Sequence, residues 1–414
     1  MPERTEIRLG EYQSARIGIE QLTSRDVDRL HALQDRGGLT LTPDRTGWRL
    51  KADATVGVLI LDRVRLVLEP KFAIPGAQLM RWLAYALAAP VPHQATARPW
   101  ATDHDGYADL IAAALLAECQ ALLRDGLRRD YVRQERLEPL VRGRLDVAAQ
   151  ATRRYGQLDQ LHVRTFDREP DIWDNRVLGT ALKAALPLAR NPDLARALHQ
   201  TAAAFSHAPT PGAALRALDR VQYTRLNVRY HAAHSWARLL LRGGGVTDIL
   251  ADHGATAESL LLAMPALWES VVRRLVSQAA AANGGRTVPA GGATGITVRG
   301  DLGNSSTFRP DVLVSLPARD TAQPRLLPVD AKYKRYDRQS VGADDVHQLL
   351  TYIAGYAPDD TPTAVIIHPQ PGGHTHRTLR VVGPARTLGT IHVLGIDTHA
   401  TPDEAVTIVR SALR

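Results

Sequence analysis

Short apolar runs separated by turn-forming residues characterise the first part of the chain. β-branched and leucine-rich segments between Gly, Pro and Asp clusters are typical of short strands. They predict strands at LTLT, GWRLKA, VGVLIL and RVRLVLEPKF, that is 39–42, 47–52, 56–61 and 63–72. A short helix is predicted at SRDVDRLHALQDR, with Ser24 as its N-cap. Residues 1–76 are therefore expected to form a β-rich module, a small antiparallel sheet or barrel.

The pattern changes after residue 76 to apolar positions spaced three and four residues apart, which is typical of amphipathic helices. Helices are predicted within 76–89, 108–127, 174–190, 192–208 and 230–245. Asp174 or Asn175 is the expected cap of the third. Between the second and third helices, the segment 140–175 has polar, turn-rich ends that flank two strand-like pieces. We therefore predict a mainly helical middle region at 77–247.

The last part of the chain mixes both patterns. A helix is predicted at MPALWESVVRRLVSQAAAA, with Pro265 in its first turn. Strands are predicted at GITVRG, DVLVSL, RLLPVDAKY, TAVIIHP, HRTLRVVG and TIHVLGID, and helices at ADDVHQLLTYIAGYA and TPDEAVTIVRSALR. An α/β domain at 248–414 accounts for this alternation. The whole chain is thus predicted to be a multidomain α+β protein.

Composition narrows the classes of function. The chain has 414 residues and a formal net charge of +8, which favours an anionic partner such as nucleic acid. An arginine-rich composition without a focused patch remains the alternative. The single cysteine, Cys119, excludes an internal disulfide and a cysteine-based metal site, and we expect it to pack as an apolar group on a helix. The charged N-terminus and the absence of a run of about 20 apolar residues favour a cytoplasmic protein.

Three charged residues occupy positions that strands normally disfavour. Asp311 begins one predicted strand, and Asp330 and Lys332 end the next. Residues two apart share a face of a strand, so Asp330 and Lys332 point the same way while Ala331 points into the core. Two carboxylates can hold Mg²⁺, and a lysine beside them can orient water or offset charge on a phosphorane. The alternatives are a turn cap for Asp311 and a charged edge strand for Lys332.

Further polar residues can join this cluster. Glu269, on the preceding helix, would supply a third carboxylate, although an ion pair with Arg273 four residues on is the ordinary explanation. Gln348 and Tyr352 lie four apart on one face of the following helix and can orient the lysine, the water or a phosphate. A surface position for Gln348 and a core position for Tyr352 are the alternatives.

Other chemistry-bearing residues carry weaker signals. The pairs His231 and His234, and His374 and His376, lack a carboxylate at zinc-site spacing, so a metal role is not favoured. Two basic segments, LLRDGLRRDYVRQERLEPLVRGR and RLNVRYHAAHSWARLLLR, either follow a DNA path or form solvated helix faces.

The order of several motifs resembles a known family. RPDVLV, PVDAKYK, DVHQLLTYIAGY and AVIIHP resemble the PD-(D/E)xK nuclease pattern as it occurs in McrC, the nuclease subunit of the McrBC 5-methylcytosine-specific restriction system. MPALWESVV, VRGRLDV, FDREPDIWDNRVLGTAL, LVLEPKF and LMRWLAYAL extend the resemblance over about residues 55 to 370. It implies a restriction-endonuclease-like domain in which Asp311 and Asp330 hold Mg²⁺ and Lys332 is catalytic. Glu269 matches by position more than by motif.

The resemblance also implies a division of labour. The family's nuclease subunit docks through its N-terminal module on a hexameric AAA+ GTPase, McrB, which binds the GTP and recognises modified DNA. The absence of G-x-x-x-x-G-K-[ST] from this chain agrees with that division. Each such site cuts one strand, so double-strand cleavage would require two complexes to meet.

We therefore expect a cytoplasmic Mg²⁺-dependent DNA endonuclease subunit of a type IV restriction complex used in antiviral defence. Two alternatives remain open at this point. In the first, the chain is a non-catalytic coupling subunit that activates an NTPase ring. In the second, it is a stand-alone PD-(D/E)xK nuclease.

Overall fold

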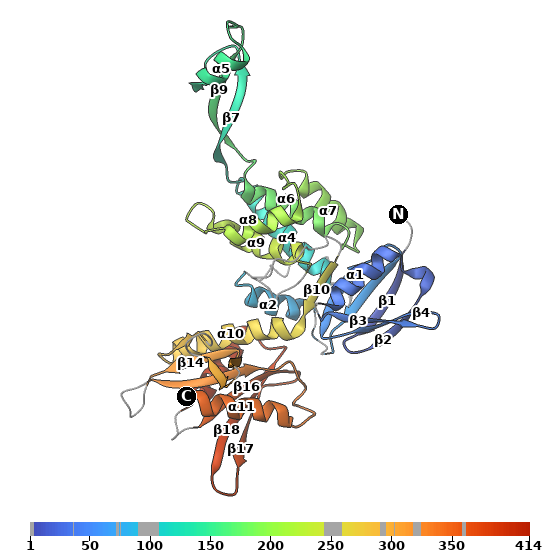
Figure 1. The fold of residues 1–414 in the computed structure, drawn as a ribbon, viewed down its shortest axis with the longest axis vertical. Helices are drawn as coiled ribbons and strands as arrows, with labels where there is room; N and C mark the ends of the chain where they lie inside the picture. Colours follow the sequence, from blue (N-terminus) through green and yellow to red (C-terminus); the bar gives the residue numbers. More distant parts are fainter. Residues whose placement is uncertain are drawn as a thin grey trace.

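The computed structural model describes residues 4–35, 37–71, 74, 76–89, 107–243, 259–289, 295–301, 303–317, 324–357 and 362–414. Figure 1 shows an elongated molecule with a projecting arm at one end, a helical body, an N-terminal module at the side and the C-terminal sheet at the other end. Within the described ranges, no helix is long and apolar enough to cross a bilayer.

The N-terminal module contains two sheets with a helix against them. Its elements are β1 (Thr5–Gly10), β2 (Ser14–Gly18), η1 (Ile19–Gln21), α1 (Ser24–Gln34), β3 (Leu39–Asp44), β4 (Gly47–Ala52), β5 (Thr55–Ile60) and β6 (Val64–Glu69). The order β2-β4-β3 is antiparallel as predicted, but β1 pairs with β6 in parallel, so the module is not purely antiparallel. The parallel pair was missed because no strand was predicted at Thr5–Gly10.

The strand β10 (Ser259–Ala263) joins this module from far along the chain. It pairs antiparallel with β5 and completes a four-stranded sheet of order β1-β6-β5-β10. Every residue of β5 is buried, as expected for a strand with neighbours on both edges and both faces covered. Leu261 packs into the core of the N-terminal module, whereas Leu260 and Leu262 pack into the main core.

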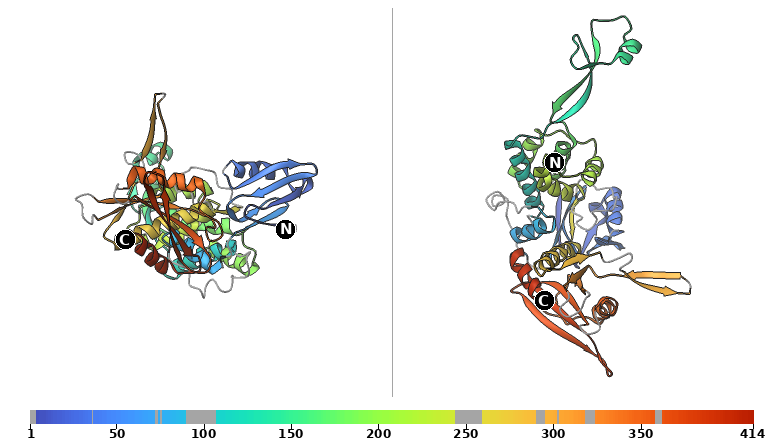
Figure 2. Two further views of the ribbon diagram at one scale, coloured as in Figure 1. Left: turned by 90° about the horizontal axis from the view of Figure 1, so that it is seen from below. Right: turned by 90° about the vertical axis from the view of Figure 1, so that its left-hand side faces the viewer.

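The helical body and the arm follow one another along the chain. The body contains α2 (Gly76–Ala86), α4 (Tyr107–Arg124), α6 (Trp173–Ala185), α7 (Pro192–Ala202), α8 (Pro211–Arg220), η3 (Val228–Tyr230) and α9 (His231–Leu241). The arm contains β7 (Asp130–Glu138), β8 (Arg144–Leu145), α5 (Val147–Arg153) and β9 (Leu161–Glu169). β7 and β9 pair over their full length and stand away from the body in Figure 1 and in the right-hand view of Figure 2. Cys119 is buried on α4, as predicted.

Two predicted helix caps are wrong. Thr23, not Ser24, caps α1, because its hydroxyl accepts the amide of Asp26 while the Asp26 carboxylate accepts the amide of Thr23. α6 begins at Trp173, so Asp174 and Asn175 lie inside the helix and are buried there.

The C-terminal sheet is mixed. Its elements are α10 (Met264–Ala282), β11 (Arg286–Val288), β12 (Ile296–Gly300), β13 (Gly303–Phe308), β14 (Val312–Leu316), β15 (Arg325–Ala331), α11 (Ala343–Tyr356), β16 (Thr363–Gln370), β17 (Thr375–Val382), β18 (Thr387–Asp397) and α12 (Pro402–Ala412). The strand order is β11-β14-β15-β16-β18-β17, and β12 and β13 form a separate hairpin. Helices α10 and α12 pack on one face and α11 on the other.

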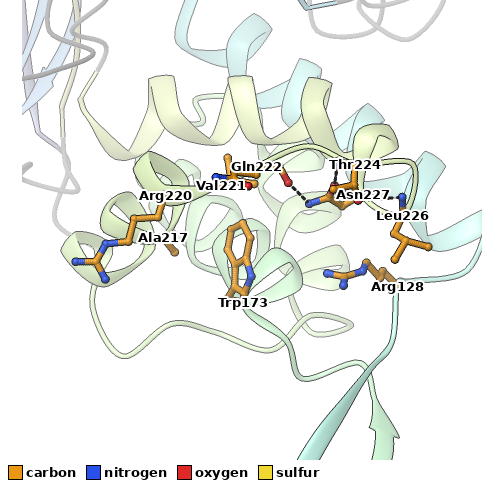
Figure 3. A pocket seen from close by; sticks show the side chains of 9 residues that line it. All are labelled: Arg128, Trp173, Ala217, Arg220, Val221, Gln222, Thr224, Leu226 and Asn227. Atoms are coloured by element: carbon orange, nitrogen blue, oxygen red, sulfur yellow. Dashed lines mark hydrogen bonds between the residues drawn. The ribbon is translucent and has the colours of Figure 1, made fainter.

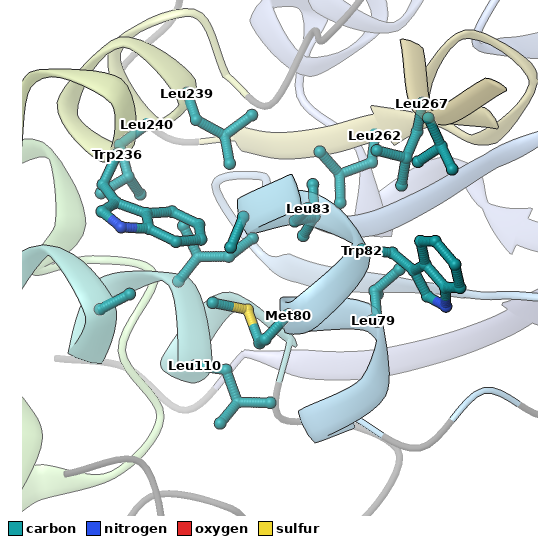
Figure 4. Close-up of a cluster of buried hydrophobic side chains, with 14 of the residues drawn as sticks. Leu79, Met80, Trp82, Leu83, Leu110, Trp236, Leu239, Leu240, Leu262 and Leu267 are labelled. Atoms are coloured by element: carbon teal, nitrogen blue, oxygen red, sulfur yellow. The ribbon is translucent and has the colours of Figure 1, made fainter. Parts of the chain in front are cut away.

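One continuous core joins these parts. Helix α2 lies between the other helices of the body and α10, and its side chains Leu79, Met80 and Leu83 meet residues of α4, α9 and β10 (Figure 4). Trp82 of α2 lies edge-to-face with Trp268 of α10, with ring centroids 6.4 Å apart. The indole of Trp82 donates to the Thr398 carbonyl at 2.9 Å, and that of Trp268 to the Ile367 carbonyl at 3.0 Å. These contacts attach the helical body to the C-terminal sheet.

Candidate active site

The two aspartates singled out from the sequence lie at the same end of adjacent strands. Asp311 directly precedes β14 and Asp330 is the penultimate residue of β15. β14 and β15 pair antiparallel with Val312 opposite Val329, which brings the two carboxylates together. The predicted pairing of these strands is confirmed.

The backbone between the aspartates and the lysine fixes Asp311. The amide of Ala331 donates to Asp311 Oδ2 at 2.7 Å, so the carboxylate is tied to the neighbouring strand. The Ala331 side chain packs against the main core, as strand alternation predicted. Asp330 is also buried, with 2% of its surface exposed, so it lies beneath the surface and not on a solvated face.

Lys332 is held from several sides. Its Nζ lies 2.7 Å from Asp330 Oδ2 and 3.5 Å from Asp345 Oδ1, and it donates to Gln348 Oε1 at 2.7 Å. The side chain is only 17% exposed, which differs from a charged residue on an open edge strand. Gln348 therefore contacts the lysine as the sequence predicted, and fixes the direction of its ammonium group.

Tyr352 extends this network toward Asp311. Gln348 Nε2 donates to the Tyr352 hydroxyl at 2.8 Å, and that hydroxyl donates to the Arg309 carbonyl at 2.6 Å. The ring of Tyr352 packs in the core beneath α11, so it is a core residue with a bonded hydroxyl. A chain of hydrogen bonds thus connects the lysine to the segment that leads into Asp311.

Burial and mutual repulsion make both carboxylates reluctant to ionise. Burial, reinforced by the charge of Asp311, raises the pKa of Asp330 to about 6, although Lys332 opposes the shift. Burial also raises the pKa of Asp311, with a contribution from the charge of Glu269. Burial alone would lower the pKa of Lys332, but its ion pair with Asp330 outweighs that effect and the net pKa is raised. The lysine is therefore an ammonium at neutral pH.

The site has the properties of a binding place for a divalent cation. Asp330 Oδ2 is buried and has no aligned hydrogen bond, although Lys332 Nζ lies 2.7 Å away as an ion pair. A buried carboxylate oxygen beside a second carboxylate matches the oxygen ligands that Mg²⁺ prefers. No group of three or more His, Cys, Asp or Glu side chains is arranged to hold a metal within the described parts of the chain. The pair fits Mg²⁺, which keeps several waters when one or two carboxylates bind it.

Glu269 lies near the pair without joining it. The residue is on α10 and forms an ion pair with Arg273 one turn later, as the ordinary explanation of its position anticipated. Its charge nevertheless contributes to the raised pKa of Asp311, so the two carboxylates lie near one another. Its side chain is 38% exposed, so it also contacts solvent.

Sequence reasoning missed Asp345. This residue lies in the first turn of α11, is 4% exposed, and accepts bonds from Lys334 at 2.7 Å and from the Tyr336 hydroxyl at 2.5 Å. Burial opposes its ionisation, but these bonds outweigh that effect and lower its pKa. Its spacing three residues before Gln348 was the available signal, because residues three apart share a helix face. The general preference for acidic residues in a first helical turn obscured it.

Other candidate features have structural roles. His234 is buried and bonded to the Asp174 carbonyl and the Tyr223 hydroxyl, and burial lowers its pKa to about 4. A cavity of about 650 Å³ lies at the root of the arm, where Trp173 and Arg128 line it (Figure 3). Arg128 is ion-paired with Asp130 and Asp174, and Arg220 also lines this cavity.

Comparisons with known proteins agree with the fold and the motifs. The family model described as "McrBC 5-methylcytosine restriction system component" matches residues 50–369. No curated protein gives a significant match. One similar solved structure is a half-complex from a tetradecameric assembly of Thermococcus gammatolerans McrB AAA+ hexamers with bound McrC. It has 17% identity and a TM-score of 0.66, over 99% of this chain and 100% of that one. Another is the cryo-EM structure of the Thermococcus gammatolerans McrBC complex, with 19% identity, a TM-score of 0.47, and coverage of 66% and 88%.

The first of these likenesses extends along nearly the whole chain and shows a shared multi-sheet α+β fold. The family model covers well over half of the 414 residues, including both aspartates and Lys332. The chain therefore belongs to the family of McrBC 5-methylcytosine restriction system components.

Proposed function

We propose that this chain is the DNA endonuclease subunit of a modification-dependent (type IV) restriction complex in the cytoplasm, where it hydrolyses phosphodiester bonds with Mg²⁺. The observation that carries the proposal is the convergence of Asp311, Asp330 and Lys332 at one end of the pair β14–β15. Buried, mutually repelling carboxylates with a fixed ammonium are costly to fold unless a cation and an anion are to be bound.

Each residue has a defined task in this proposal. Asp311 and Asp330 would hold Mg²⁺, which supplies a Lewis acid for the phosphate and lowers the pKa of a bound water. Lys332, directed by Asp330 and Gln348, orients the attacking water and offsets the negative charge that develops on the phosphorane. Tyr352 keeps Gln348 in place through its own bond to the backbone.

The partner in this proposal is an AAA+ GTPase hexamer. Family membership and the solved structure of McrB hexamers with bound McrC support this partner. Besides the N-terminal module, which the resemblance implies as the docking site, the arm offers an exposed apolar surface for this partner, because Tyr155 and Leu158 are 87% and 77% exposed. The partner would bind the GTP, since this chain carries no phosphate-binding G-x-x-x-x-G-K-[ST] motif.

Cleavage of a methylated plasmid tests the catalytic assignment. The full chain is combined with an McrB-like AAA+ GTPase, GTP, Mg²⁺ and a plasmid that contains 5-methylcytosine. Lys332→Ala and Asp330→Ala are expected to lower the cleavage rate by about 10²–10³-fold. Lys183→Ala, at an exposed position on α6, is the matched control and should cleave normally.

The outcome also separates the alternative functions. Cleavage at the unaltered rate by Lys332→Ala and Asp330→Ala would overturn the nuclease assignment. Stimulation of GTP hydrolysis by these same variants would show that coupling is separable from cleavage. Cleavage by the isolated chain without nucleotide would instead favour a stand-alone nuclease.

Glu269 requires a test of its own, because an ion pair with Arg273 already explains it. We propose that its carboxylate helps to hold the metal or the water at the mouth of the site. Glu269→Gln should then lower the cleavage rate about 10-fold or more, whereas Arg273→Ala should leave it nearly unchanged. Equal and small effects of both substitutions would mean that Glu269 has no role beyond its ion pair with Arg273.

A further inference from the structure

The residue directly after Lys332 is buried against the N-terminal module. The hydroxyl of Tyr333 donates to Glu11 Oε1 at 3.0 Å, across 322 positions of sequence. Lys71 Nζ lies 4.2 Å from the centroid of the Tyr333 ring and donates to the Tyr333 carbonyl at 2.9 Å. Tyr333 and Glu11 are only 7% and 6% exposed. The module therefore contacts both the side chain and the backbone of this residue.

The parallel pairing of β1 with β6 brings Glu11 and Lys71 together. The two strands end in register, with Gly10 opposite Glu69, and the amide of Glu11 donates to the Glu69 carbonyl at 2.9 Å. Glu11 follows one strand end and Lys71 follows the other. The cluster of Glu11, Lys71 and Tyr333 is thus a rigid consequence of the module's sheet.

Burial of the polar groups in this cluster is energetically unfavourable. Glu11 Oε2 is buried without a hydrogen-bond partner, and burial raises the pKa of the Glu11 carboxyl to about 7. The pairing of β10 with β5, with Leu261 in the core of the N-terminal module, already holds the module to the segment that leads into α10. Polar groups at such a contact add orientation, because a hydrogen bond has a required direction and apolar packing has none.

The orientation of Tyr333 sets that of Lys332. Consecutive side chains of an extended backbone point to opposite sides, so Tyr333 faces the module while Lys332 faces Asp330 and Gln348. The amide of Lys332 is bonded to the Ile367 carbonyl on β16 at 3.0 Å. The peptide that carries the lysine is therefore held by the sheet on one side and by the module on the other.

We propose that Glu11 and Lys71 are positioning residues that align Lys332 through Tyr333. The position of the N-terminal module relative to the C-terminal sheet then controls the rate of DNA cleavage. This inference rests on the proposed catalytic role of Lys332. We call the contacts of Glu11 and Lys71 with Tyr333 the clamp. A misplacement of about 1 Å at a reacting group reduces a rate by up to about 100-fold, so loss of the clamp lowers kcat and leaves DNA binding intact.

The test compares two inter-module tyrosines in the full chain. Tyr333→Phe removes the bond to Glu11 and keeps the ring. Tyr85→Phe is the matched control, because the Tyr85 hydroxyl of α2 donates to Gln278 Oε1 of α10 at 2.6 Å, away from Lys332. The rate of Lys332 modification by an amine-reactive reagent, followed by mass spectrometry, reports the clamp without requiring activity. Cleavage kinetics with the GTPase partner report its effect on catalysis.

Tyr333→Phe and Lys71→Met are expected to lower kcat about 10-fold with KM unchanged, and to raise the rate of Lys332 modification. Lys71→Arg keeps a cation over the ring and should restore most of kcat. Tyr85→Phe should alter neither readout.

Unaltered modification and unaltered kcat in both Tyr333→Phe and Lys71→Met overturn the inference. If Lys332→Ala still cleaves DNA, the proposed function fails instead, while the modification rate still tests the clamp. If Tyr333→Phe fails to fold, Lys71→Met alone decides, since it leaves the bond between Tyr333 and Glu11 intact.

Discussion

At the scale of single residues, the candidate site is built from charges that folding disfavours. Burial raises the pKa of Asp311, Asp330 and Glu11, so each carboxyl group is more easily ionised in the unfolded chain than in the folded one. Such groups persist where a function requires them, because neutral residues of the same size would be more stable. Stability measurements can therefore detect the cost of the site without any assay of its activity.

Asp330→Asn is expected to stabilise the chain in the absence of metal. The pKa of Asp330 rises from 3.8 to about 6 on folding, so the stability difference between variant and wild type opens as pH rises from about 4 to about 6. At pH 7 in EDTA the variant should unfold with a free energy about 1–3 kcal/mol higher, measured by urea titration. A variant less stable than wild type at pH 7 would contradict this account.

A matched control for Asp330→Asn is available on the surface. Asp159 pairs with Arg154, and that bond lowers the pKa of Asp159, whereas the pKa of Asp330 is raised. Asp159→Asn should leave stability unchanged or slightly reduced at pH 7, because exposed ion pairs contribute little.

Glu11→Gln is also expected to stabilise the chain, over a different range of pH from Asp330→Asn. The pKa of Glu11 is raised from 4.5 to about 7 by burial, against the opposing charge of Lys71 and the bond from Tyr333. Wild-type stability should fall relative to the variant between about pH 4.5 and pH 7, by on the order of 2 kcal/mol. Urea unfolding of both proteins at pH 4.5, 6 and 8 measures the difference. A difference that is constant with pH would show that Glu11 titrates normally.

The sequence could predict those site residues whose neighbours are close along the chain. Strand alternation places Asp330 and Lys332 on one side, and helical spacing places Gln348 beside Tyr352. The contact between Glu11 and Tyr333 was not predictable, since it depends on how a module formed by the first residues sits on the C-terminal sheet. No local pattern records a contact across 322 residues.

At the scale of elements, the predictable features were those with strong periodicity. The helix α10 has Pro265 in its first turn and ends at Ala282, as the sequence predicted. Strand-like pieces were predicted only within 140–175, which contains β9. β7 was missed, because its largely polar side chains led that stretch to be interpreted as a basic DNA path or a solvated helix face. In β10, the leucines alternate between two cores that belong to different parts of the chain.

The seam between β5 and β10 depends on one glycine. Gly57 has φ +138, and a Cβ there would lie 1.9 Å from the Leu260 carbonyl oxygen. Gly57→Ala should destabilise the chain by about 3 kcal/mol or more, because backbone strain and a clash with β10 add. Gly372→Ala is the control, since Gly372 has φ +87 but nothing within 4 Å, and should cost only about 1 kcal/mol. Equal losses in urea unfolding would show that the seam tolerates a side chain.

At the scale of the whole molecule, the arm and the candidate site lie at opposite ends. Figure 1 shows the arm beyond the helical body and the C-terminal sheet on the far side of α2 and α10. Exposed apolar side chains concentrate on the arm, including those of Tyr131, Leu140, Tyr155, Leu158 and Phe166. A partner on the arm would therefore act on the site through the body or by bringing DNA to it.

Deletion of the arm should leave the fold intact. Asp130 and Glu169 are opposite one another in the pair β7–β9, so a short Gly-Ser turn can replace 131–168. We expect the free energy of unfolding to change by about 1 kcal/mol or less, because only a few arm side chains are buried. Stimulation of the GTPase partner should be lost, whereas Lys332 modification should be unchanged. Full stimulation by the deletion variant would place the partner contact elsewhere.

The alternation of Leu261 with Leu260 and Leu262 has a consequence for how such a protein can evolve. A strand that completes the first module's sheet is encoded just before α10, with the rest of the C-terminal sheet. Recombination that exchanged only the C-terminal half would also replace one strand of the N-terminal sheet. The two halves must therefore be inherited together or change in step, and a lineage can acquire new partners more easily by altering the arm than by shuffling its ends.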